Sequence, residues 1–172
     1  MATENTRFTV EDTSYICGSL RKSGVLESMI ILLKRNTLNA ALYNTLFVIL
    51  GNMCTIDVDI NYKKNIDRLL KLGIIDVIKH NLISRDEQTL KYSLACLQNI
   101  TSYAISNSFI DPYYIMGLVK PICYSKNTSC QKYATGIVHN LLVYYDMPNN
   151  LPEHLKDLLK NRINEFNQFK IT

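Results

Sequence analysis

The sequence predicts an all-α protein built from about three repeated helical units. Three apolar segments carry an asparagine in the same frame: FVILGNMC around Asn52, SLACLQNIT around Asn99 and TGIVHNLL around Asn140. Asn99 follows Asn52 by 47 residues and Asn140 follows Asn99 by 41, close to the period of about 40 to 47 residues of helical repeat arrays. Residues five and two before each asparagine, and one after it, have the spacing of a helical core stripe. These residues are Phe47, Leu50 and Met53; Leu94, Leu97 and Ile100; Thr135, Val138 and Leu141.

The segments before the first two asparagines support the same repeat. SLRKSGVLESMIILLKRN (19–36) and RLLKLGIIDVIKHNLISRD (68–86) each contain a short helical piece, a glycine, an apolar helix and a polar turn. Gly24 and Gly73 occupy the same point, where a helix is expected to end. The third unit, YYIMGLVKPICYSKNTSCQKY (113–133), is shorter, and Pro121 should start or kink its middle helix.

A last helix is expected after the third unit, over NNLPEHLKDLLKNRINEFNQF (149–169). Asn150 is its candidate N-cap, and its polar outer residues suit a terminal cap. Its expected buried face consists of Leu151, Leu155, Leu158, Leu159, Arg162, Phe166 and Phe169. The expected helices cover residues 13–23, 25–35, 37–55, 62–72, 74–83, 86–104, 117–125, 128–145 and 151–168.

This pattern resembles the armadillo repeat family over about residues 13–146. The resemblance implies a right-handed α-solenoid of about three armadillo-like three-helix repeats plus a C-terminal capping helix, in one domain over residues 1–172. The repeats would span about 13–57, 62–105 and 108–146, with the cap at 150–169. A HEAT-like or irregular α-solenoid is the alternative.

Composition narrows the class of protein. The chain has 172 residues, of which 47% are hydrophobic, but it has neither a membrane-spanning apolar run nor a secretory-type amino terminus. We therefore expect an intracellular, cytoplasmic protein, with a cytoskeletal or ciliary location as one form of this. The five cysteines form no CxxC pair and are expected to be reduced core thiols. The net charge is +4, and the lysines and arginines are interleaved with acidic residues rather than gathered in a block. This distribution is not typical of a dedicated nucleic-acid binder.

In the armadillo family, third helices line the concave face, and a row of asparagines there holds the backbone of an extended partner peptide. Asn52, Asn99 and Asn140 are the residues that match this row. A carboxamide suits the role because it offers both a donor and an acceptor to a peptide backbone. The alternative is that each asparagine bonds to the neighbouring repeat.

The chain departs from the importin-type pattern, in which a tryptophan lies one turn before each asparagine. It contains no tryptophan, so a nuclear-localisation-signal receptor of that type is not expected. The matching residues are Val48, Ala95 and Gly136, and two turns before the asparagines stand Asn44, Lys91 and Lys132. Tyr92, Tyr133, Gln98 and His139 complete the candidate partner-binding face. Such a polar to basic groove would suit an acidic or phosphorylated segment, unless the lysines are merely solvated.

Neither catalysis nor a cofactor is indicated. The chain lacks GxGxxG, GxxxxGK[ST] and HExxH, and its three histidines are isolated in the sequence. We therefore expect no enzyme activity, no metal site and no small-molecule substrate. The stretch 57–61, DVDIN, matches the start of a calcium loop, but Tyr62 replaces the required glycine and Arg68 replaces the bidentate glutamate. It is interpreted as an inserted loop that lengthens the first spacing.

Two functions follow from the sequence. The first is a protein-binding adaptor whose concave face holds an extended peptide. The second is a structural subunit of a larger cytoskeletal, ciliary or axonemal assembly, which docks through its outer helices and cap. A nucleic-acid-binding repeat protein is a less well supported hypothesis. Arrays that read bases need a planar or bidentate side chain facing each base, and the row Gly51, Gln98 and His139 is not consistent in this respect.

Overall fold

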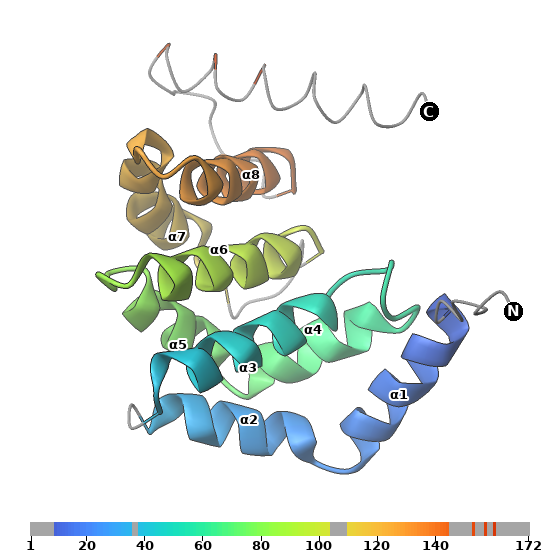
Figure 1. The fold of residues 1–172 in the computed structure, drawn as a ribbon. Coiled ribbons are helices and arrows are strands. Elements are labelled where there is room, and N and C mark those ends of the chain that lie inside the picture. Colours follow the sequence, from blue (N-terminus) through green and yellow to red (C-terminus); the bar gives the residue numbers. More distant parts are fainter. Residues whose placement is uncertain are drawn as a thin grey trace, which may run out of the picture.

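The computed structural model describes residues 9–35, 38–103, 110–144, 153, 157 and 160. Every regular element in this part of the chain is a helix, which confirms the all-α prediction (Figure 1). The helices are α1 (Val10–Lys22), α2 (Val25–Lys34), α3 (Ala40–Asn52), α4 (Tyr62–Lys71), α5 (Ile74–Asn81), α6 (Glu87–Thr101), α7 (Pro112–Val119), the 3₁₀ helix η1 (Lys120–Tyr124) and α8 (Thr128–Tyr144).

Polar side chains set where several helices begin. Thr9 caps α1 in a capping box with Asp12, so this helix starts three residues before its expected start. Asn39 and Asp86 accept hydrogen bonds from the backbone of the first turns of α3 and α6. Where α2 and α5 begin, Gly24 and Gly73 have φ of 75° and 80°. This left-handed conformation favours glycine, and it explains the matching glycines of the first two units.

The third unit differs from its expected helix over residues 117–125, and that prediction was wrong. Asp111 accepts hydrogen bonds from the amides of Tyr113 and Tyr114, and Pro112 lies in the first turn, so α7 begins at residue 112. The helix ends at Val119, and a 3₁₀ turn containing Pro121 follows it. The expected cap over 151–168 lies outside the described residues except for Glu153, Asp157 and Lys160, which are helical.

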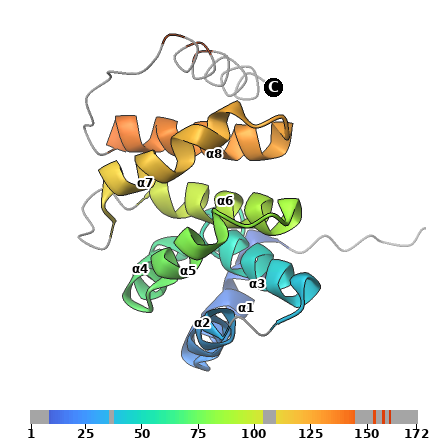
Figure 2. The same ribbon diagram turned by 90° about the vertical axis from the view of Figure 1, so that its left-hand side faces the viewer.

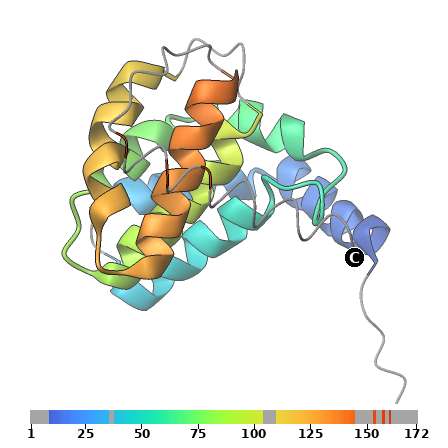
Figure 3. The ribbon, with the colours of Figure 1, turned by 90° about the horizontal axis from the view of Figure 1, so that it is seen from above.

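The helices α3, α6 and α8 lie side by side, one above the other (Figures 1 and 2). The three core stripes expected from the sequence are all buried; Leu50, Leu94 and Leu97, for example, have no exposed surface. The helix α5 contacts both α2 and α6, and α7 and η1 contact α8. Seen from above, α1 projects from the side of this stack (Figure 3).

A substitution of Leu97 would measure how much packing in the central part of the core contributes to stability. Its side chain is fully buried, whereas 43% of Leu42 on α3 is exposed. We expect Leu97→Ala to lower the free energy of unfolding by about 2 to 5 kcal/mol, because it removes buried methyl groups and leaves a cavity. Leu42→Ala is the control and should cost less than about 1 kcal/mol. Urea denaturation would measure both, and equal losses would contradict the packing described.

Candidate functional site

Two residues of the asparagine row, Asn99 and Asn140, join α6 to α3 and α8 to α6. The Asn99 Nδ2 donates a hydrogen bond to the backbone oxygen of Gly51 at 3.0 Å. The Asn140 Nδ2 donates to the backbone oxygen of Gln98 at 2.9 Å and to Thr101 Oγ1 at 3.1 Å. Both backbone acceptors lie just before the asparagine of the preceding unit, near a helix end, and each accepts a backbone amide hydrogen bond as well. The structure therefore places Asn99 and Asn140 in contacts between units.

The three asparagines differ in their access to solvent. Asn52 is exposed, Asn99 is half-buried and Asn140 is 8% exposed. No described residue forms a hydrogen bond with the Asn52 side chain. The row therefore does not present three equivalent amides to solvent, although the Asn52 amide and the Asn99 Oδ1 are left for other partners.

Gln98 is a packing residue where α6 meets α8. A Cβ added to Gly136 would lie 2.7 Å from Cδ of Gln98, so the glutamine side chain lies directly over the α8 backbone. Within the described residues, the Gln98 Oε1 is buried without a hydrogen-bond partner. The earlier pair α3 and α6 also approaches closely at a glycine, because a Cβ on Gly51 would lie 3.4 Å from the Cα of Cys96.

The lysines and tyrosines two turns before the asparagines are partly or fully exposed, and both tyrosines also pack against the core. On α6, Lys91 and Tyr92 are half-buried, and the Lys91 Nζ lies 5.1 Å from the Tyr92 ring centroid in a cation–π contact. On α8, Lys132 is exposed and Tyr133 is half-buried. His139, next to Asn140, is half-buried.

Further bonds fix the register between third helices at their other ends. The Asn127 Nδ2 donates to Glu87 Oε2 at 2.8 Å at the start of α6. The Thr89 Oγ1 donates to Asn44 Oδ1 at 2.9 Å, so Asn44 contacts the next unit. Together with the asparagine bonds, these contacts hold α3, α6 and α8 parallel and in the register of the sequence repeat.

The stretch 57–61 is a structural connector. Asp59 is fully buried; it forms an ion pair with Arg21 of α1, accepts a hydrogen bond from Asn65 Nδ2 at 2.8 Å, and accepts another from the Asn61 amide at 2.9 Å. Asn65, also fully buried, donates to the Met53 carbonyl at 2.6 Å. This network joins α1, the loop and α4. The repeat pattern does not predict the roles of Arg21 and Asn65. The one sequence feature that indicates this network is the amide of Asn65 within an apolar helical face.

Hydrogen bonding controls the pKa of Asp59. Burial raises the pKa, but the hydrogen bonds from Asn61, Arg21 and Asn65 and the charge of Arg21 outweigh burial and hold it below its ordinary value.

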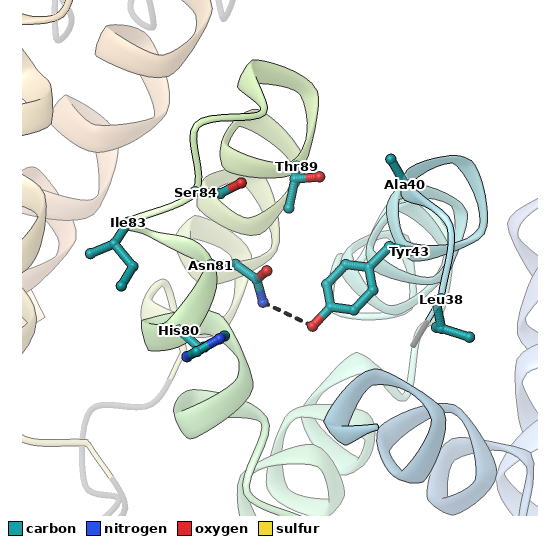
Figure 4. A pocket seen from close by; sticks show the side chains of 8 residues that line it. All are labelled: Leu38, Ala40, Tyr43, His80, Asn81, Ile83, Ser84 and Thr89. Atoms are coloured by element: carbon teal, nitrogen blue, oxygen red, sulfur yellow. Dashed lines mark hydrogen bonds between the residues drawn. The ribbon is translucent and has the colours of Figure 1, made fainter. Parts of the chain in front are cut away.

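Two adjoining cavities lie at the end of the stack where α3 and α6 begin. The larger, about 450 Å³, has Tyr43 and Asn81 among its lining residues (Figure 4). The smaller, about 320 Å³, shares Tyr43 and His80 with it. This site was not predicted from the sequence, because the residues that form it recur at no repeat spacing.

The described cysteines are unpaired and buried, as expected. Burial raises the pKa of Cys96 to about 12 and the pKa of Cys123 to about 11. These two thiols therefore remain protonated at neutral pH and are poor nucleophiles. Among the described residues, no group of His, Cys, Asp or Glu is arranged to hold a metal ion, and no helix is long and apolar enough to cross a membrane.

The asparagines provide a direct stability test. Asn140→Ala removes two hydrogen bonds between α8 and α6, each of which contributes about 0.5 to 1.5 kcal/mol, so we expect a loss of about 1 to 3 kcal/mol in the free energy of unfolding. Asn52→Ala removes an exposed amide and should change it by less than about 0.5 kcal/mol. Chemical denaturation would compare them, and a neutral Asn140→Ala would rule out a stabilising role for this contact.

The Asp59 network should make stability depend on pH in the acid range. Because the pKa of folded Asp59 is lowered from 3.8, its contribution is present above about pH 4 and is lost as pH falls through the folded pKa. At pH 7, Asp59→Asn should cost about 3 kcal/mol, since it leaves Arg21 without its partner. Near pH 2 the difference from the wild type should shrink, whereas the exposed Asp57→Asn should have little effect at either pH. A constant difference would contradict this assignment.

No family model, curated protein or solved structure matches the chain. The armadillo resemblance therefore stays a prediction from the repeat pattern.

Proposed function

We propose that this protein is a non-enzymatic scaffold that binds an extended acidic peptide segment across α6 and α8. The observation that carries the proposal is the matching position of two lysine–tyrosine pairs on neighbouring helices. Lys91 and Tyr92 stand eight and seven residues before Asn99, and Lys132 and Tyr133 stand eight and seven before Asn140. The Asn140 bond to Gln98 supports this alignment in space.

The geometry suits an extended chain. Packed helices lie about 8 to 10 Å apart, and residues of an extended strand advance about 3.3 Å each. Acidic side chains two or three residues apart could therefore reach Lys91 and Lys132 together. The tyrosine rings beside the lysines add apolar area and hydroxyl groups, which suit a peptide better than a free ion.

The neighbouring asparagines would extend this surface rather than form it. Asn52 offers a complete amide and Asn99 offers its oxygen, while Asn140 and Gln98 are occupied in packing. The recurrence of equivalent bonds between units supports an armadillo-like α-solenoid as the overall architecture. The unpaired cysteines support an intracellular location.

A second candidate, the structural subunit, is favoured by exposed apolar residues on α1 and the loop after α3. The exposed fractions are 79% for Tyr15, 48% for Ile16 and 60% for both Ile56 and Ile60. The Ile60 amide donates to Ser14 Oγ at 2.9 Å, which places the loop against α1. Exposed apolar surface of this kind is typical of docking faces.

Charge reversal tests the peptide-binding surface. A fluorescent peptide of about ten alternating Glu and Ala residues would span about 33 Å, and its binding can be followed by fluorescence anisotropy. Lys91→Glu with Lys132→Glu should weaken binding by at least about tenfold, because attraction becomes repulsion.

The matched control is Lys64→Glu with Lys71→Glu, which makes the same charge change at exposed positions of α4. It should retain most of the affinity. Wild-type binding should also weaken as salt rises from about 50 to 300 mM. If both double variants lost affinity equally, the net charge of the protein alone would explain the binding. If the wild type did not bind the acidic peptide, the structural-subunit alternative would be favoured.

A further inference from the structure

One wall of the larger cavity is formed by Asn81, a largely buried residue whose side-chain oxygen accepts no hydrogen bond from the described residues. Asn81 is 7% exposed, and its Nδ2 donates to the Val77 carbonyl at 2.6 Å and to the Tyr43 hydroxyl at 3.1 Å. The Tyr43 hydroxyl in turn donates to the Leu33 carbonyl at 3.0 Å. These bonds fix the orientation of the amide. The Asn81 Oδ1 accepts no hydrogen bond from the described residues and points into the cavity (Figure 4).

A donor lies on the same wall as this acceptor. The Ser84 Oγ accepts a hydrogen bond from the Asp86 amide at 3.1 Å, which leaves its own hydrogen for a ligand. The Thr89 Oγ1 already donates to Asn44, so toward the cavity it can only accept. An acceptor and a donor side by side complement the N–H and C=O groups of a peptide.

The remaining walls are neutral or apolar. Leu38, Ala40 and Ile83 line the cavity, and its lining residues with titratable rings are Tyr43 and His80. No lining residue carries a permanent charge, so nothing there would pair with a phosphate, carboxylate or ammonium group. A volume of about 450 Å³ is large enough for an apolar side chain together with the adjoining peptide groups.

We propose that this cavity is a second recognition site, which takes an apolar residue of an extended partner peptide and bonds its backbone N–H to Asn81 Oδ1. Ser84 donates to the peptide carbonyl, and Leu38, Ala40 and Ile83 contact the apolar side chain. The site is independent of the basic surface on α6 and α8, because neither Lys91 nor Lys132 lines it.

The probe is N-acetyl-leucine methylamide, which supplies one apolar side chain between two peptide groups. In ¹H–¹⁵N spectra of the full chain, we expect the Asn81 side-chain amide and the Ser84 backbone amide to be among the largest shifts. The Kd should be on the order of 1 mM, as expected for so small a ligand. The fully N-methylated probe has no N–H and should bind at least about tenfold more weakly, because it displaces water from the Asn81 Oδ1 without replacing the hydrogen bond.

Two alanines provide matched variants. Ala40 and Ala41 are both exposed in the first turn of α3, but only Ala40 lines the cavity. Ala40→Phe should abolish binding and Ala41→Phe should retain it, with thermal melts showing that both fold. Ser84→Ala, which leaves the walls intact, should weaken binding of the parent probe.

Three results would overturn the proposal: no shift at Asn81 up to about 20 mM probe, equal binding of the two probes, or unchanged binding to Ala40→Phe. The first would mean that water is the occupant of the cavity. Because the probe is neutral, its failure leaves the acidic-peptide proposal standing, and failure of that proposal leaves this one standing.

Discussion

The structure depends on one recurring interaction within the stack of α3, α6 and α8. In it, an asparagine side chain of one helix donates a hydrogen bond to a backbone carbonyl near the end of the preceding helix of the stack. Asn99 reaches the Gly51 carbonyl and Asn140 reaches the Gln98 carbonyl. These carbonyls lie in the last turns of their helices, and each also accepts a backbone hydrogen bond, from Cys54 and from Ser102 respectively. The asparagine bond uses the remaining acceptor capacity of the carbonyl and fixes the register of the two helices. With the register set, the leucines of adjacent stripes meet, and the backbones can approach closely at Gly51 and Gly136.

Bonds of a different kind hold α1 in place. Arg21 reaches Asp59 and Asn65, while Thr13 Oγ1 donates to the Val58 carbonyl at 2.6 Å. The loop that makes the first spacing longer than the second is therefore the anchor for α1. A buried ion pair contributes less than its Coulomb energy, because both charges lose water, but losing either partner is costly. This explains why a short connector contains such a buried carboxylate.

The spacing of the apolar residues predicted the all-α class and the buried stripes, because burial on a helix is periodic. The matching positions of Gly24 and Gly73 can also be seen in the sequence, and both residues have the left-handed conformation. The role of the asparagines could not be decided in this way, since an amide that bonds to a ligand and one that bonds to a neighbouring helix require the same pattern. The cavity was missed for a different reason. Tyr43 and Asn81 are 38 residues apart, which matches neither repeat spacing, so no periodic pattern indicates their contact.

The use of the asparagines within the fold changes what recognition must depend on. Because Asn99 and Asn140 donate from their Nδ2 groups to the preceding helix, they cannot both donate to and accept from a peptide backbone along the whole face. Attraction on the α6 and α8 surface must then come mainly from Lys91 and Lys132, and such attraction is screened by salt and selects weakly among acidic sequences. The cavity at Asn81 has the opposite character. Its acceptor, the Asn81 Oδ1, is costly to leave unpaired once a ligand excludes water, so the cavity would discriminate by shape and hydrogen bonding rather than by charge. A scaffold with both surfaces would recruit acidic partners by charge and select among them by an apolar residue.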